Sequence, residues 1–276
     1  MSFNRKTRKF PLFILASMLF VLFIFPFVLV LINSFKDRIA IIENPLALSE
    51  VIRFSNYLKA FQTMNYMASF VNSLMITIVS VLLIIIFSSM FAYFLVRWNW
   101  KMNKLIFTAL ITSMIVPFQA IMIPFVTIYG NLSLLNNKWA LCFFYLGFGI
   151  SLATFMYHGF IKTIPLELEQ AAMLDGASAF QAFWRIVFPI LKPVTTTIVI
   201  LDVLWIWNDF LLPSLVLISE ENRTLPLTTF YFFGKYTSNY GSAMAALVLS
   251  IFPVLIFYFL MQRQIIQGVM DGSIKQ

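Results

Sequence analysis

The sequence predicts an all-α, polytopic membrane protein with six transmembrane helices. Hydrophobic residues make up 61% of its 276 residues and charged residues only 11%, and the mean hydropathy is +0.90. A soluble domain with a mixed polar surface does not reach such values. No segment outside the apolar runs is long enough to bury a core of its own, so we expect a single transmembrane domain over 1–276.

Long runs without charged residues give the positions of the spans. A helix needs about 20 mostly apolar residues to cross a bilayer. Such runs predict helices at 11–33, 70–95, 106–129, 139–160 and 243–262. A sixth span is predicted at 194–218, although this run carries Asp202 and Asp209. The first run is too long for a cleaved signal peptide, so we expect it to stay as an anchor.

The orientation of the spans follows from the Lys and Arg residues in the loops. With the N-terminus inside, twelve of the nineteen Lys and Arg residues fall on the cytoplasmic side, and the bias is strongest in the first segment, RKTRK. The prediction is a multi-pass protein of the plasma or inner membrane with both termini in the cytoplasm. The polar segment 163–193, between two apolar runs, is then cytoplasmic as well.

The segment 163–193 is predicted to form a helix-turn-helix. Strong helix formers in LEQAAML lead to Gly176, which ends the first helix. Ser178 and Gln181 have the spacing of a capping box, which starts a second helix. The apolar face of this second helix consists of Phe180, Phe183, Trp184 and Val187. The pair either lies on the lipid surface as an anchor, or fits a groove on a cytoplasmic partner where Ala171, Ala172 and Gly176 admit a close backbone.

Two carboxylates at membrane depth indicate a substrate pathway. Asp202 and Asp209 are seven residues apart, so a continuous helix would place them on one face with Trp205 and, within a turn, Asn208. Such carboxylates are costly unless they face a wet cavity or a partner. An aromatic ring beside carboxylate and amide groups suits a sugar. A structural interpretation stays open, in which Asp209 and Asn208 cap a break in the helix before Pro213, or bond to a neighbouring helix.

The chain lacks the common signatures of catalysis. It contains no P-loop, HExxH motif, CxxC pair or Ser/His/Asp signature. Its one cysteine, Cys142, excludes an intrachain disulfide. We therefore expect no enzyme activity, no catalytic residue and no metal site. The net charge of +8 is spread over the loops of a membrane protein, so we expect lipid and no nucleic acid as its surroundings.

The segment 163–193 resembles the EAA loop of ATP-binding-cassette importer permeases. That loop reads Glu-Ala-Ala, three residues, Gly, nine residues, Ile, one residue, Leu, Pro. Here Gln170-Ala171-Ala172, Gly176, Ile186, Phe188 and Pro189 follow the same spacing, with Gln170 and Phe188 replacing the usual Glu and Leu. The resemblance implies that this coupling loop (163–193) docks an ATPase. The implied coupling residues are Glu169, Gln170, Ala171, Ala172, Asp175, Gly176, Ile186 and Pro189.

Gln170 changes one expected contact of the coupling loop. In this family the motif glutamate pairs with a basic residue of the ATPase, and Gln170 can donate and accept hydrogen bonds but cannot form that ion pair. Two alternatives follow: the contact at Gln170 is neutral, or the neighbouring Glu169 takes part.

The stretches FVNSLMIT, WNDFLLPSLVL, RTLPL and IIQGVMDGSIKQ are similar to MalG-like permeases of carbohydrate importers. The resemblance implies a second, homologous permease, two copies of a cytoplasmic ATPase that bind ATP and Mg²⁺, and an extracytoplasmic sugar-binding protein. It implies no cofactor on this chain itself, and it assigns most sugar contacts to the companion permease. The cytoplasmic tail 263–276 is expected to reach the ATPase through Gly268, Gly272 and Lys275.

Two other functions remain as alternatives. The loop motif is shared among importers, so the solute could instead be a polyamine, a phosphate or an amino acid. A different class is a membrane-bound enzyme or a secondary transporter that uses Asp202 and Asp209 as a proton relay. Dependence of transport on the ATPase or on the proton gradient separates the two classes.

Overall fold

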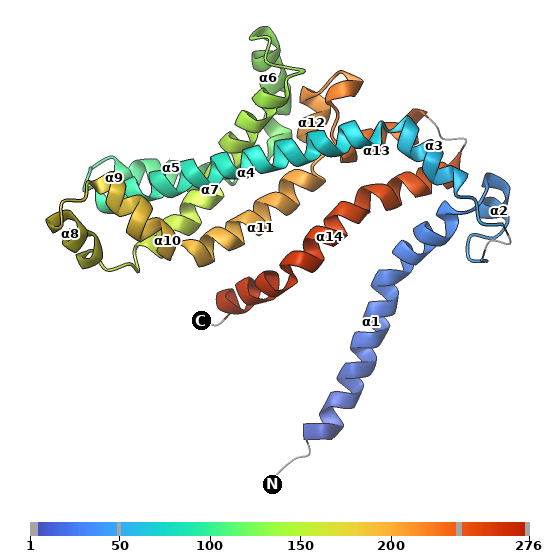
Figure 1. Ribbon diagram of the computed structural model, residues 1–276, viewed down its shortest axis with the longest axis horizontal. Coiled ribbons are helices and arrows are strands. Elements are labelled where there is room, and N and C mark those ends of the chain that lie inside the picture. The colour runs from blue at the N-terminus through green and yellow to red at the C-terminus, as the bar shows by residue number, and fades with distance from the viewer. Residues whose placement is uncertain (1–4, 49–50, 236–238, 274–276) are drawn as a thin grey trace. The chain divides into compact units, whose positions relative to one another are not determined.

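A computed structural model describes residues 5–48, 51–235 and 239–273 (Figure 1). Over these residues the fold is helical and without strands, which confirms the predicted all-α class. The elements are α1 (Arg5–Ser34), α2 (Arg38–Glu43), α3 (Ser55–Thr63), α4 (Tyr66–Arg97), α5 (Asn103–Ser113), α6 (Phe118–Asn131), α7 (Lys138–Ile161), α8 (Glu167–Leu174), α9 (Ala179–Ala182), the π-helix η1 (Phe183–Val187), α10 (Phe188–Ile190), α11 (Lys192–Asn208), α12 (Leu211–Val216), the 3₁₀-helix η2 (Glu220–Asn222), α13 (Leu225–Lys235) and α14 (Tyr240–Ser273).

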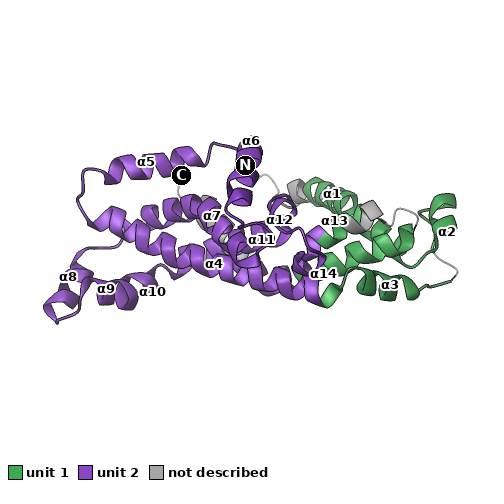
Figure 2. Cartoon of the chain, turned by 90° about the horizontal axis from the view of Figure 1, so that it is seen from above, with its two compact units in different colours: residues 1–67, 228–253 green, residues 68–227, 254–276 purple. Residues whose placement is uncertain are grey.

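The chain divides into two compact units (Figure 2). Unit 1 comprises residues 1–67 and 228–253, and unit 2 comprises residues 68–227 and 254–276. Unit 2 contains the coupling loop and all four residues of the predicted substrate pathway. The single transmembrane domain expected from the sequence stays a prediction.

Within the described residues, four helices are long and apolar enough to cross a membrane unaided. They are 11–34 of α1, α4, α7 and 240–264 of α14. Two bent pairs, α5 with α6 and 179–190 with α11, raise the number to six if each pair counts as one span. The spans predicted at 11–33, 70–95, 139–160 and 243–262 therefore lie on these four helices.

The span predicted at 106–129 is wrong as a single helix. The structure has α5 and α6 there, bent by 101° at the short break between them. Pro117 lies in this break with extended backbone (φ −70°, ψ 139°) and precedes α6 directly. A proline lacks the N–H group that a continuous helix needs and drives the residue before it out of helical geometry, which accounts for the break.

The span predicted at 194–218 is also wrong as a single helix. α11 ends at Asn208, Asp209 has extended backbone (φ −71°, ψ 132°), and α12 begins at Leu211. Asp202 and Asp209 therefore do not share a face of one helix. The break at Asp209 is the one that the structural interpretation of this residue predicts.

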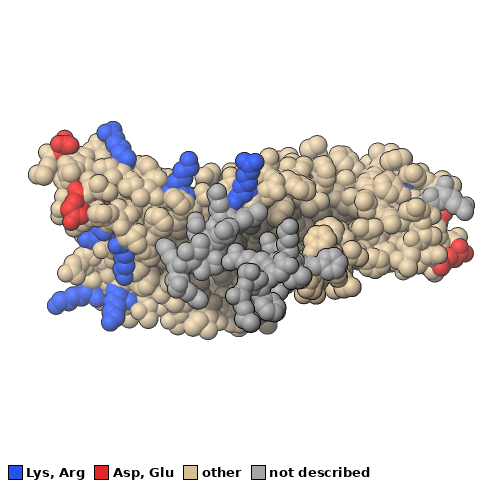
Figure 3. Space-filling model, turned by 90° about the horizontal axis from the view of Figure 1, so that it is seen from below, with Lys and Arg blue, Asp and Glu red and all other residues tan. Residues whose placement is uncertain are grey.

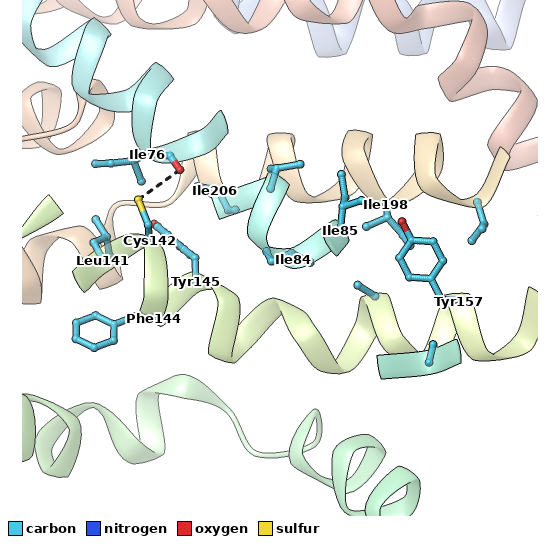
Figure 4. Close-up of a cluster of buried hydrophobic side chains, with 14 of the residues drawn as sticks. Ile76, Ile84, Ile85, Leu141, Cys142, Phe144, Tyr145, Tyr157, Ile198 and Ile206 are labelled. Atoms are coloured by element: carbon cyan, nitrogen blue, oxygen red, sulfur yellow. Dashed lines mark hydrogen bonds between the residues drawn. The ribbon is translucent and has the colours of Figure 1, made fainter. Parts of the chain in front are cut away.

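The core of unit 2 forms where α4, α7 and α11 meet (Figure 4). Ile84 of α4, Tyr145 and Tyr157 of α7, and Ile198 of α11 are almost fully buried there. α4 and α7 approach closely because Gly149 has no side chain: a β-carbon at this position would lie 2.5 Å from Cδ1 of Ile84. Cys142 belongs to the same cluster and is buried as a free thiol.

In unit 1, the chain after α1 is held by side-chain amides and a close glycine contact. Asn56 Nδ2 donates to the carbonyls of Ser34 and Lys36 at 2.9 and 2.8 Å. Gly241 lies so near the Lys36 carbonyl and the Asn56 amide that a β-carbon would clash with both. Lys36 Nζ donates to the Asn44 carbonyl at 3.0 Å, and burial lowers the pKa of this ammonium group.

Candidate functional site

The first helix of the coupling loop ends in a Schellman motif built on Gly176. Gly176 has a backbone φ of +90°, a conformation that residues other than glycine rarely adopt. Its N–H donates to the Met173 carbonyl at 3.1 Å, and the next N–H, of Ala177, donates to the Ala172 carbonyl at 2.9 Å. A β-carbon on Gly176 would meet nothing within 4 Å, so this elbow is open to a partner.

The second helix begins at the predicted capping box. The Ser178 hydroxyl accepts from the Gln181 N–H, and the Gln181 side chain accepts from the Ser178 N–H. The helix then widens into the π-helix η1, in which the Phe188 N–H donates to the Phe183 carbonyl, five residues back. Pro189 follows, and its missing N–H and bulky ring disfavour the ordinary four-residue pattern at this point. The predicted helix-turn-helix is therefore present.

The apolar face of the second helix is divided between the core and the surface. Phe183 and Val187 are buried in the core of unit 2, whereas Phe180 is 62% exposed. On the first helix, Leu174 is 89% exposed. Apolar side chains with this exposure at the two sides of the elbow form a surface suited to a partner, while Phe183 and Val187 fix the helix to its own chain.

The coupling residues implied by the family pattern fall into two groups. Most lie at the surface: Gln170, Ala171, Asp175, Gly176 and Pro189 are exposed, and Ala172 and Ile186 are half-buried. Glu169 differs, because its side chain is only 1% exposed. The tail residues Gly268 and Gly272 fall within α14, but their surroundings lie outside the described residues, as does Lys275 altogether.

Glu169 is buried against the end of α4, with both carboxylate oxygens bound. Its Oε1 accepts from Arg97 Nε at 2.8 Å and lies 2.7 Å from Arg97 Nη2. Its Oε2 accepts from the Tyr93 hydroxyl at 2.6 Å. Arg97 Nη2 also donates to the Ile164 carbonyl at 2.9 Å. In this structure Gln170, and not Glu169, is the neighbour that faces outward.

Charged side chains gather at the end of unit 2 that carries α8. On the face shown in Figure 3, Lys and Arg side chains cluster there with Asp and Glu beside them, and most of the described surface of unit 2 beyond them is uncharged. Exposed Lys162, Arg185 and Lys192 of unit 2 belong to the loop and its flanks. Such a boundary between charged and uncharged surface is expected where a membrane protein leaves the hydrocarbon layer.

A cavity of about 430 Å³ lies in unit 2 where two helix breaks face each other. Its walls come from the α5–α6 bend, α7 and the end of α11 with the start of α12. Gln119, Phe118 and Phe148 contribute to the lining together with Trp205 and Asp209. Irregular backbone at membrane depth is tolerated where it lines a cavity, and transporters build binding sites from interrupted helices in this way.

Two of the four predicted pathway residues, Trp205 and Asp209, line the cavity. Trp205 is 41% exposed, and its ring packs edge-on against Tyr145 at 5.5 Å. Asp209 Oδ2 accepts from the Tyr145 hydroxyl at 2.9 Å, and its Oδ1 accepts from the Leu211 N–H at 2.9 Å. The carboxylate thus caps the break in the helix and also borders the cavity.

The other two predicted residues are absent from the lining. Asp202 is 4% exposed on a different part of α11, and its Oδ2 has no hydrogen-bond partner among the described residues. Asn208 is exposed, and its Nδ2 donates back to the Leu204 carbonyl at 2.7 Å. Sequence reasoning missed Gln119 and Phe118, although the signal was available: Gln119 is a polar residue two positions after Pro117 inside a long apolar run.

Comparison with known proteins identifies the family. Residues 84–271 match the family described as "Binding-protein-dependent transport system inner membrane component". The chain is 44% identical to the probable starch degradation products transport system permease protein AmyC of Thermoanaerobacterium thermosulfurigenes, over 98% of each chain. It is 34% identical to the multiple sugar-binding transport system permease protein MsmG of Streptococcus mutans, over 99% of each chain.

A solved structure shares the fold. A chain of a bacterial ABC transporter that imports the acidic polysaccharide alginate superposes with a TM-score of 0.77 and 24% identity, covering 95% of this chain and 99% of that one. The relatives confirm the resemblance to carbohydrate importer permeases seen in the sequence. Because they are transport permeases, they also confirm that the chain is not an enzyme. The chain belongs to the family of binding-protein-dependent transport system inner membrane components.

Proposed function

We propose that this chain is the permease subunit of an ATP-driven importer of uncharged saccharides. The coupling loop docks a cytoplasmic ATPase, an extracytoplasmic binding protein delivers the sugar, and a second, homologous permease completes the pathway. The observation that carries the proposal is the exposed helix-turn-helix around Gly176, which has the motif spacing and an open elbow. Relatives named as sugar permeases over nearly the whole chain support the same function.

The proposed assembly contains two copies of the ATPase, which bind ATP and Mg²⁺, while this chain binds no cofactor. Both termini and the coupling loop lie on the cytoplasmic side. Closure of the ATPase dimer on ATP moves the two coupling loops and switches the paired permeases from inward-facing to outward-facing, and hydrolysis resets them. The exposed residues Gln170, Asp175 and Gly176 meet the ATPase in this scheme, and the tail residues Gly268, Gly272 and Lys275 approach its dimer interface.

The lining of the cavity supports an uncharged saccharide as the solute. Trp205 and Phe118 offer apolar ring faces, and Gln119 offers an amide that both donates and accepts hydrogen bonds. Asp209 is the one carboxylate among the lining residues, and no Lys, Arg or His is among them. An acidic sugar entering this cavity would meet a negative charge without a compensating cation, which disfavours its binding. Asp202 and Asn208 lie outside the lining and are assigned no contact with the sugar.

Uptake by the reconstituted importer tests the proposal. Proteoliposomes that contain this chain with its companion permease and ATPase are given the binding protein and either radiolabelled maltotriose or raffinose. We expect uptake of at least one of these neutral sugars to require ATP on the ATPase side and to resist an uncoupling ionophore. We also expect an excess of alginate trisaccharide to compete poorly. Uptake that does not require ATP and is abolished by the ionophore would contradict the proposal and would support a secondary transporter.

The same vesicles test the cavity. Gln119→Leu removes the amide from the lining, and we expect the half-saturation concentration for sugar to rise about tenfold, the effect of losing one hydrogen bond to a bound ligand. Gln62→Leu makes the same change at an exposed position of α3 in unit 1 and serves as the matched control. Equal kinetics in both variants would remove the cavity from the sugar pathway.

A further inference from the structure

The end of α4 holds both helices of the coupling loop through one small cluster of side chains. Tyr93, Arg97 and Glu169, here called the fastening cluster, connect residues more than 70 positions apart in the sequence. Tyr93 also packs its ring against Phe183 of η1, with centroids 5.0 Å apart. The last turn of α4 therefore contacts α8 through Glu169 and the second helix of the loop through Phe183.

The charges of the fastening cluster are satisfied within the chain. The side chains of Arg97 and Glu169 are 13% and 1% exposed, and three donor groups meet the two carboxylate oxygens at 2.6 to 2.8 Å. A carboxylate bound in this way has no free oxygen directed at a partner. Separating the members of such a pair leaves uncompensated charge in the interior, so movements that part Arg97 from Glu169 are disfavoured.

Exposure separates Glu169 from its neighbours on α8. Glu167, Gln170 and Leu174 face outward, where a partner can contact them, whereas Glu169 faces inward to α4. A force applied by a partner to the outer face of α8 therefore reaches α4 through Glu169 and Arg97. The backbone link through Ile164 strengthens the same connection, because Arg97 also binds its carbonyl.

α4 extends from this cluster to the packing beside Trp205, which is one of the residues that line the cavity. Ile84, thirteen residues before Arg97 on the same helix, lies beside Gly149 of α7, and Trp205 approaches the same point: a β-carbon on Gly149 would be 3.5 Å from its ring. A helix transmits a displacement along its axis because its backbone hydrogen bonds form a continuous ladder. α4 thus joins the coupling loop to the packing around Trp205 within unit 2.

We propose that Tyr93, Arg97 and Glu169 are positioning residues that transmit the movement of the coupling loop to α4, and that Glu169 acts on its own chain and not on the ATPase. The proposal rests on the proposed function, since it assumes that an ATPase moves the loop. The proposal assigns two roles to α8: its outward-facing side chains bind the ATPase, and Glu169 transmits the movement of α8 to α4.

The ratio of sugar transported to ATP hydrolysed tests the proposal. In Glu169→Gln the charge is lost at constant size, and in Arg97→Lys the charge stays but the two-pronged contact is lost. We expect both variants to copurify with the ATPase as the unchanged protein does, while the ratio falls about tenfold, within the range for residues that couple two sites. Tyr93→Phe keeps the ring on Phe183 and removes one hydroxyl, and it should fold normally and lower the ratio about threefold.

Glu43→Gln is the matched control, because it removes the same charge from an exposed position of α2, outside the coupling loop, and it should leave the ratio unchanged. An unchanged ratio in folded complexes of all three cluster variants would reduce the cluster to a structural role and overturn the proposal. Loss of ATPase copurification in Glu169→Gln would overturn it too, by placing Glu169 at the ATPase. Failure of the unchanged complex to use ATP would instead refute the proposed function.

Discussion

Two glycines of α7, two residues apart, have different surroundings. A β-carbon on Gly149 would lie 2.5 Å from Cδ1 and 3.1 Å from Cγ1 of Ile84, whereas one on Gly147 would meet nothing within 4 Å. We expect Gly149→Ala to destabilise the protein by about 1–2 kcal/mol, because overpacking exceeds the gain in helix propensity. Gly147→Ala should be neutral or slightly stabilising. Thermal unfolding of the purified protein in detergent measures both effects.

Ile84→Val provides the rescue for this prediction. It removes the Cδ1 atom that an alanine at position 149 would contact first, so the double variant should be less destabilised than the sum of the two single variants. Additive effects would show that α4 and α7 shift apart instead of packing at this contact, and would contradict the interpretation.

Neighbouring residues on α8 show what the sequence can and cannot reveal about single positions. The motif spacing placed Gln170 and Gly176 in a loop that is exposed in the structure, because turns and helix caps depend on residues that are close together in the sequence. The burial of Glu169 depends on Arg97, which comes from another helix 72 residues earlier. No periodicity within the loop contains that information, so the sequence left the roles of Glu169 and Gln170 open.

At the scale of elements, helix ends were predictable where a capping group determines them. The Ser178 capping box and the stop at Gly176 are both present as expected. The break between α5 and α6 was not recognised, because hydropathy measures how apolar a stretch is and not whether it is straight. The break at Asp209 was one of two interpretations that the sequence left open. Pro117 and Asp209 mark those breaks, and together they create the cavity.

The elbow at Gly176 gives a prediction for the coupling loop as an element. Gly176→Trp adds a bulky side chain where the structure is open, and it also strains a backbone with φ +90°. We expect this variant to insert in the membrane but to lose copurification with the ATPase and sugar uptake. Gly176→Ala imposes the same backbone strain with little bulk, and it should retain most of the association.

The comparison of the two variants separates contact from strain. Loss of association in both would attribute the effect to the backbone of the loop, and association retained in both would place the ATPase elsewhere. Only a loss specific to tryptophan supports the elbow as the docking surface. The amount of protein in the membrane fraction is the control for insertion.

At the scale of the whole molecule, composition was enough to predict a helical membrane protein, because a chain this apolar satisfies its backbone in lipid only as helices or a closed barrel. The pairing of the helices was not predictable. α4, α7 and α11 present apolar residues on most of their faces, so the sequence does not say which face meets which neighbour. Small features such as Gly149, which admits Ile84, decide that packing.

The orientation of the chain gives a prediction at the same scale. The native Cys142 is 1% exposed, so engineered cysteines can be labelled with little background. Glu167 in the coupling loop and Glu220 in η2 are both at the surface. With the N-terminus inside, Glu220→Cys should react with a membrane-impermeant maleimide in intact protoplasts, and Glu167→Cys only after permeabilisation. The opposite pattern would place the coupling loop outside, away from any cytoplasmic ATPase, and both proposals for this loop would then fail.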